Sequence, residues 1–242
     1  MAVFSGPEIV NNGLLLHVDA ANLRSYPGSG ATWSDISNNS GTGTLINGPT
    51  FDSNNNGSIT FDGSNDRIHI PSTSRKYSWA PVGTTGNKVL SLECWVKTSD
   101  TAGNIISKPW NDSGNYNYRI TASTFFTQVA TFHSLSFTSI ADGNWKHLVA
   151  IANETQKAVY VNGVLSAGYT NHSEISDIPS LGDLNVSLTL MSLYPYEGPA
   201  GPTSRPEQAV LGGASIFKIY NKELSAAEIK QNFNAIRSRY GI

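Results

Sequence analysis

Apolar residues recur mostly at every second position along the chain, which is the pattern of β-strands with one buried face. Residues 90–97 are the clearest example. One face is apolar and the other mostly polar: Leu90, Leu92, Cys94 and Val96 against Ser91, Glu93, Trp95 and Lys97. Residues 145–152 are apolar on both faces, so they predict a central strand.

Two pairs of alternating segments flank short turn sequences, and each pair predicts a β-hairpin. Residues 58–62 and 67–71 lie on either side of Gly63-Ser-Asn-Asp66. Residues 157–161 and 164–165 flank Asn162-Gly163, the strongest two-residue hairpin signal. Further strands are expected at 13–18, 117–121, 129–137, 186–193 and 209–220. Strands at this spacing predict an all-β sandwich or jelly roll of antiparallel sheets.

One helix is predicted near the end of the chain. Ser225 is a good N-cap and Glu228 completes a capping box, while Leu224 and Ile229 form a hydrophobic staple. Apolar residues at helical spacing form one stripe, which we expect to pack onto a sheet. We expect Gly241 to cap the C-terminus of the helix. The stripe contains Ile229, Phe233, Ile236 and Tyr240.

The chain has no internal linker, composition shift or repeat, so we expect a single domain over residues 13–242. Residues 1–12 lack a strand pattern. We interpret them as an N-terminal tail or as an arm that docks on a neighbouring molecule.

Composition narrows the class of protein further. Charged residues make up 14% of the 242 residues, and 30 Ser, 19 Thr and 23 Asn supply the polar surface instead. These residues are poor helix formers, which argues against a helical bundle. The net charge of −2 gives no electrostatic case for nucleic acid. No apolar run approaches the roughly 20 residues of a membrane helix, so we expect no membrane insertion.

The single cysteine, Cys94, excludes an intrachain disulfide and a cysteine-based zinc site. The N-terminus has neither the basic start nor the apolar segment of a signal peptide. We therefore expect synthesis in a reducing cytoplasm without export through a cleaved signal.

Several segments carry a family resemblance. Residues 58–66 and 90–96 resemble early strands of concanavalin A-like, laminin-G-type domains, and residues 143–149 with 159–163 are similar to that family's most recognisable hairpin. Residues 213–229 resemble its closing strand and short helix. The resemblance implies a jelly roll of two antiparallel sheets with one short C-terminal helix. It implies no single function, because this fold carries lectins, glycosidases and adhesion modules.

The N-terminal stretch resembles a narrower group. Residues 14–22, 26–30, 33–37 and 47–51 look like the opening of such domains in virion proteins of tailed phages, particularly phages of aquatic bacteria. Phage particles assemble in the cytoplasm and leave by lysis. The resemblance therefore implies a location in the virion, and an extracellular one after release.

The sequence lacks the carboxylate pattern of the family's glycosidases, which is Glu-x-Asp-x-x-Glu on one strand face. The nearest fragment, Glu174-Ile-Ser-Asp177, has the wrong spacing. Glu93 is interpreted as part of a polar face packed under a loop. The histidines, which show no metal-type spacing, are His17, His69, His133, His147 and His172. We expect a non-catalytic protein that requires no cofactor.

Two aromatic segments are candidate ligand contacts. The loop at 194–207 contains Tyr194, Tyr196, Glu197 and Arg205, which combine aromatic faces with hydrogen-bonding groups. Its alternative role is protein contact or capping of the sandwich edge. The segment 110–118 offers Trp110, Asn111 and Tyr116 as a sugar platform, with ordinary turn chemistry and strand pairing as the alternative. We interpret Trp33, Trp79, Trp95 and Trp145 as core or half-covered residues.

Calcium is common in relatives, and the resemblance makes Asp19, Asp62 and Asp66 the residues for a structural calcium. Asp62 and Asp66 also flank a turn, where aspartate is favoured without a metal.

The sequence therefore predicts a structural or adhesive virion protein that decorates a capsid, neck or fibre. Its expected partners are other virion proteins, further copies of itself and cell-surface glycans. The alternatives are a free-standing carbohydrate-binding lectin and, less favoured, a glycosidase or lyase of the same superfamily.

Overall fold

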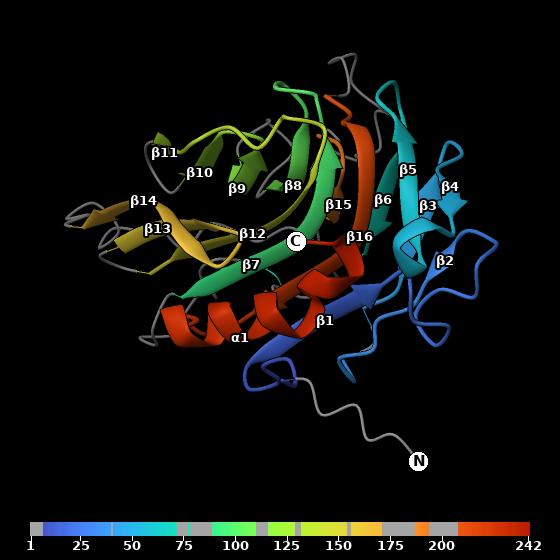
Figure 1. Ribbon diagram of the computed structural model, residues 1–242. Coiled ribbons are helices and arrows are strands. Elements are labelled where there is room, and N and C mark those ends of the chain that lie inside the picture. Colours follow the sequence, from blue (N-terminus) through green and yellow to red (C-terminus); the bar gives the residue numbers. More distant parts are fainter. Residues whose placement is uncertain are drawn as a thin grey trace.

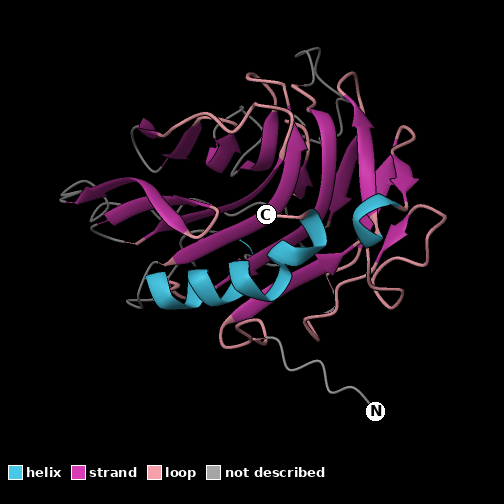
Figure 2. Cartoon of the chain, viewed as in Figure 1, coloured by secondary structure: helices cyan, strands magenta, loops and turns pink. Residues whose placement is uncertain are grey.

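The computed structural model describes residues 7–39, 41–71, 77, 89–109, 116–128, 132–153, 156–170, 187–193 and 208–242. Within them the chain forms two antiparallel sheets in two layers, with one α-helix on the outside (Figures 1 and 2). This confirms the predicted all-β sandwich with a short C-terminal helix.

The first sheet has the order β14 (Val164–Thr170), β13 (Gln156–Val161), β12 (Trp145–Ala152), β7 (Leu90–Thr98), β16 (Leu211–Tyr220), β5 (Ser58–Asp62) and β4 (Thr50–Asp52), with β1 (Leu14–Asp19) also paired to β16. The second has the order β11 (Phe132–Ser136), β10 (Thr124–Gln128), β9 (Tyr116–Thr121), β8 (Asn104–Pro109), β15 (Leu188–Leu190), β6 (Arg67–Ile70), β3 (Gly43–Ile46) and β2 (Thr32–Trp33). The helical segments are η1 (Asn54–Asn56), α1 (Ala226–Ile236) and η3 (Arg237–Tyr240).

The core lies between the sheets and draws side chains from both. The apolar face of β7 points into it as predicted, and β12 is a central strand between β7 and β13. Ile68 and Ile70 of β6 and Leu188 and Leu190 of β15 meet that face from the second sheet.

One of the two predicted hairpins forms and the other does not. β13 and β14 pair across Asn162 and Gly163, which have the positive φ angles of 51° and 74° that this tight turn requires. β5 and β6, in contrast, lie in different sheets, so the hairpin predicted at 58–71 is wrong. The turn between them crosses from one layer to the other. Alternation shows that a strand has one buried face, but both sheets of a sandwich bury a face in the same core.

Other strand predictions differ in extent. The strand predicted at 129–137 corresponds to β11, with residues 129–131 outside the described residues, and that predicted at 186–193 corresponds to the shorter β15. The pattern missed β2, β3, β4, β8 and β10.

The predicted helix is present, and its predicted N-terminal capping box is confirmed. The Ser225 side chain accepts a hydrogen bond from the Glu228 amide, and the Glu228 carboxylate accepts one from the Ser225 amide. α1 itself ends at Ile236, and Gly241, which was predicted to cap the helix, instead ends the following η3 with φ of 70°. Figure 1 shows α1, in red, lying across β7 and β16 on the outer face of the first sheet. None of the helices in the described part of the chain has the length and hydropathy to span a membrane.

Part of the predicted N-terminal arm lies on the domain itself. Val10 is buried, and its amide donates to the Asn232 side chain of α1 at 2.7 Å. The Glu8 carbonyl accepts a hydrogen bond from Gln231. Residues 1–6 lie outside the described residues.

Candidate functional site

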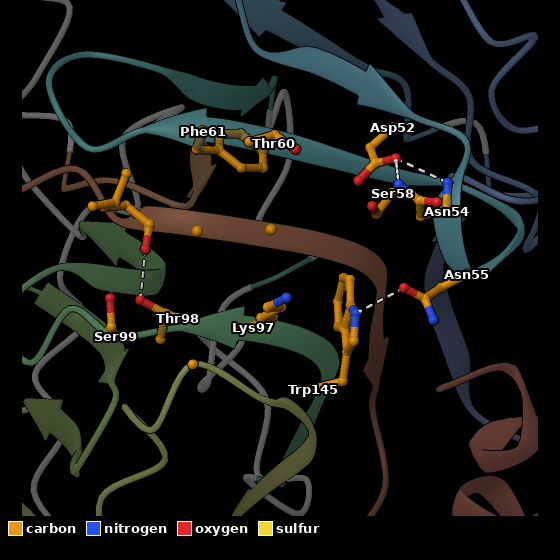
Figure 3. Close-up of a pocket in the computed structure, with 14 residues that line it drawn as sticks. Asp52, Asn54, Asn55, Ser58, Thr60, Phe61, Lys97, Thr98, Ser99 and Trp145 are labelled. Carbon is orange, nitrogen blue, oxygen red and sulfur yellow. Dashed lines mark hydrogen bonds between the residues drawn. The ribbon is translucent and has the colours of Figure 1, made fainter. Parts of the chain in front are cut away.

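The outer face of the first sheet is divided into a covered half and an open half. α1 and η3 cover the half that contains Trp95, where the Trp95 ring stacks on Phe233 and Tyr240 at centroid distances of 5.8 and 4.3 Å. The open half is hollowed into a cleft with a volume of about 680 Å³. We call it the Trp145 cleft; it is lined by Asp52, Asn54, Asn55, Ser58, Thr60, Phe61, Lys97, Thr98, Ser99, Gly143, Trp145, Leu211, Gly212 and Gly213 (Figure 3).

Strand register brings the middle of this cleft together. Trp145 of β12 lies opposite Lys97 of β7, Lys97 lies opposite Gly213 of β16, and Gly213 lies opposite Thr60 of β5. Because residues opposite one another point to the same side of a sheet, all four face outward. The row is therefore a floor that runs across four strands.

Glycine keeps this floor open. Gly213 has no positive φ angle that would require glycine, and an added Cβ would meet the Trp145 ring at 3.5 Å, an ordinary contact distance. Its lack of a side chain leaves space above the backbone, where a ligand can approach closely. At Gly212 the strand packing itself requires glycine, because a Cβ there would lie 2.2 Å from the Lys97 carbonyl oxygen.

The indole ring of Trp145 is half-buried and held from two sides. Its Nε1–H donates to Asn55 Oδ1 at 3.1 Å, and Tyr240 packs at a centroid distance of 4.8 Å. The Asn55 amide group in turn donates to the Arg239 carbonyl at 3.2 Å. Figure 3 shows the ring standing between Lys97 and Asn55. The ring is thus fixed before any ligand arrives.

Polar groups surround the ring without closing the cleft. Asp52 Oδ1 accepts hydrogen bonds from the Asn54 amide and side chain at 2.9 and 2.7 Å. The Thr98 hydroxyl donates to the Leu211 carbonyl at 2.7 Å. Lys97 and Thr60 are exposed. A fixed aromatic face beside carboxylate, amide, hydroxyl and ammonium groups matches the two surfaces of a sugar, which has an apolar ring face and polar edges.

Glu93 has a different environment from the one predicted. It is buried beneath α1, not under a loop, and Lys218 Nζ donates to its Oε1 at 2.7 Å. Asn232 donates to Oε2 at 2.6 Å, and His147 Nε2 lies 3.2 Å from Oε1. Burial alone raises a carboxyl pKa, but Lys218 and His147 outweigh it and hold the pKa of Glu93 well below its usual range. A fully buried, paired carboxylate is a structural group and not an acid accessible to substrate.

Most of the predicted ligand contacts lie outside the described residues, namely Tyr194, Tyr196, Glu197, Arg205, Trp110 and Asn111. β8 and β9 do pair across residues 110–115, as the hairpin interpretation of that segment requires. Tyr116 begins β9 opposite Pro109. The proposals for these residues remain predictions.

The three predicted calcium ligands are not gathered together. Asp19 binds Arg239 through both carboxylate oxygens, at 2.8 and 3.1 Å. Asp66 accepts the Asp62 amide at 3.0 Å, and Asp62 accepts the Ser64 amide at 2.8 Å, as turn aspartates do. No group of three His, Cys, Asp or Glu side chains that could hold a metal occurs among the described residues.

The Trp145 cleft was missed by sequence reasoning. Trp145 was expected to be a core or half-covered residue, and it is half-buried. The signals that were present are the polar position of Lys97 on its strand and the Asn54-Asn55-Asn56 run, in which Asn55 and Asn56 take positive φ angles. The strand register that brings these segments together depends on residues far apart in the sequence, so no local pattern indicates it.

Two antiparallel sheets around one core, with a cleft on an outer face, define a lectin-like jelly roll. The chain belongs to the Concanavalin A-like lectin/glucanases superfamily, whose family model matches residues 62–230. No curated protein matches the sequence.

Solved structures share the fold at low sequence identity. The binding domain of Paraclostridial Mosquitocidal Protein 1 has a TM-score of 0.64 and 11% identity, over 93% of this chain and 52% of that one. Domain 4 of AbnA, an arabinanase from Geobacillus stearothermophilus solved with arabinotriose, has a TM-score of 0.59 and 16% identity, over 91% and 98%. Botulinum neurotoxin type C, whose cell entry depends on two ganglioside molecules, has a TM-score of 0.63 and 15% identity, over 94% and 52%. This chain thus spans about half the length of the two toxin chains.

Proposed function

We propose that this chain is a non-catalytic, glycan-binding domain carried by the virion of a tailed phage. The observation that carries the glycan part is the Trp145 ring, fixed by Asn55 and Tyr240 and set among polar groups in an open cleft. Two structural relatives support it, since one is described with arabinotriose and the other depends on gangliosides. The packed sandwich holds the cleft residues in place before a ligand binds. Few side chains therefore lose conformational freedom on binding.

A glycan array tests this part of the proposal, with Trp145→Ala as the cleft variant. We expect binding to at least one glycan, and a loss of about fivefold or more in Trp145→Ala because a stacked ring contributes on the order of 1 kcal/mol beyond its buried area. Phe126→Ala is the matched control, since Phe126 is a half-buried aromatic residue on the second sheet. Gly213→Leu fills the cleft and is expected to block binding. No ligand above background contradicts the glycan proposal and leaves a purely structural role.

The virion part rests on the N-terminal resemblance and on a Ser/Thr/Asn-rich surface with a single buried cysteine. In that role the partners are other virion proteins and further copies of the chain. Mass spectrometry of purified particles is the test, and absence of the chain from particles ends the virion proposal. Glycan binding without presence in particles instead identifies the second candidate, a free-standing lectin. A glycosidase that uses Glu93 is disfavoured by the burial of that carboxylate.

A further inference from the structure

Among the described residues that line the Trp145 cleft, two have ionisable side chains, and these lie far apart within it. Lys97 is on β7 and Asp52 is on β4, with β16 and β5 between them. Three strand spacings of about 4.8 Å separate their backbones by roughly 14 Å. This exceeds the Debye length of about 8 Å at physiological ionic strength. Each charge therefore acts on a different part of a bound molecule.

Asp52 and Lys97 differ in how far their hydrogen-bonding capacity is used. One oxygen of Asp52 already accepts two hydrogen bonds from Asn54. Lys97 is exposed and has neither a hydrogen bond nor an ion pair from its side chain to any described residue. Among the described residues that line the cleft it carries the only positive charge. Its ammonium group is free to bind a ligand.

The position of Lys97 relates this charge to the aromatic ring. Trp145 lies directly opposite it on one neighbouring strand, and Gly213 lies opposite it on the other. Residues paired in this way have Cβ atoms about 5 Å apart. A sugar ring stacked on the indole therefore carries its substituents over the Lys97 ammonium, and the missing side chain at Gly213 leaves room for them.

We propose that the Trp145 cleft takes a glycan bearing a carboxylate, with Lys97 binding the carboxylate while Trp145 stacks on the sugar ring. An ammonium group beside an aromatic face recognises an acidic sugar better than a neutral one, because the charge attracts the carboxylate and the ring covers the apolar face. This inference rests on the proposed function and adds the chemical class of the ligand.

The experiment compares acidic oligosaccharides with their carboxyl-reduced forms, in which each carboxylate becomes a hydroxymethyl group. The probes are tetrasaccharides of galacturonic, glucuronic and mannuronic acid, each beside its reduced partner, with affinities measured by calorimetry at low and high salt. We expect at least one acid to bind about fivefold more tightly than its reduced partner at low salt, as for an exposed ion pair. The preference shrinks at high salt.

Two lysine variants locate the effect. Lys97→Met is expected to bind the acidic and reduced forms equally. Lys230→Met removes an exposed lysine from α1 and is expected to keep the preference. Equal wild-type affinity for the two forms overturns the inference and leaves the proposed function intact. A preference that survives in Lys97→Met also overturns it. Binding to none of the probes overturns it too, and the glycan array then decides separately whether the proposed function stands.

Discussion

Lys218→Met tests how the buried charges beneath α1 stabilise the fold. Lys218 Nζ lies 2.7 Å from Glu93 Oε1, and neither side chain is exposed to solvent. With an effective dielectric constant of 20, Coulomb's law gives an attraction of about 6 kcal/mol at that distance. Removing the ammonium loses this attraction but also removes the cost of burying it, which is several kcal/mol.

The expected net loss of stability is about 3 kcal/mol, at the lower end of the range for breaking a buried pair. The lower end applies because Asn232 still donates to Glu93 at 2.6 Å and His147 remains 3.2 Å away. The double variant Glu93→Leu with Lys218→Met leaves no unpaired charge. It should therefore be more stable than Lys218→Met alone.

Equilibrium unfolding in urea, followed by tryptophan fluorescence, measures these free energies of unfolding. Lys146→Met is the matched control, because Lys146 pairs with Asp142 at 2.6 Å on the surface. Surface pairs contribute about 1 kcal/mol or less. The reasoning is refuted if Lys218→Met destabilises the protein no more than Lys146→Met does.

Three further measurements follow from the structure. Burial and the nearby Lys218 lower the pKa of His17 to about 4, against the opposing effects of Asp19, Glu93 and Asp35. The unfolded chain binds this proton near pH 6.5, so stability should fall by up to roughly 3 kcal/mol as the pH drops from 6.5 to 4. The urea midpoint of His17→Gln should fall less over this window, and an unchanged pH dependence contradicts the assignment. Ser225→Ala removes the N-cap of α1 and should cost about 1 kcal/mol, measured as a lower Tm; no change would mean that the cap contributes nothing. A chelator should leave the Tm unchanged, and a clear decrease would support the calcium prediction.

The sequence was sufficient wherever the determinant was local. The two faces of residues 90–97 follow from alternation, the start of α1 from Ser225 and Glu228, and the β13–β14 turn from Asn162 and Gly163. Each of these depends on residues within one strand length or one helical turn.

The sequence was insufficient wherever one segment had to be placed against a distant one. Phe61 and Ile68 belong to the same core cluster, yet they enter it from opposite sheets. Their strands therefore give the same alternating pattern as a hairpin. Glu93 was expected to lie under a loop because nothing near it in sequence identifies α1, about 130 residues later, as its cover.

The Trp145 cleft depends on the same long-range placement. Thr60, Lys97, Trp145 and Gly213 come from four strands, and only the register between those strands makes them neighbours. A tryptophan in a strand that is apolar on both faces looks like a core residue. Only the register shows that Trp145 lies beside Lys97 and that the next residue in the row, Gly213, is a glycine. Composition did point to a neutral surface rich in hydroxyl and amide groups, and these groups line much of the cleft.

The covered and open halves of the first sheet meet at Tyr240, so this residue contributes both to the packing on the covered half and to the Trp145 cleft. Tyr240 stacks on Trp95 inside the covered half and packs against Trp145 at the edge of the cleft. Arg239 beside it donates to Asp19 and offers its carbonyl to Asn55, which in turn holds the Trp145 indole. The docked end of the chain therefore fixes the cleft's aromatic ring. In the proposed function, a glycan does not have to order this ring on binding because folding has already ordered it, so more of the stacking energy appears as affinity.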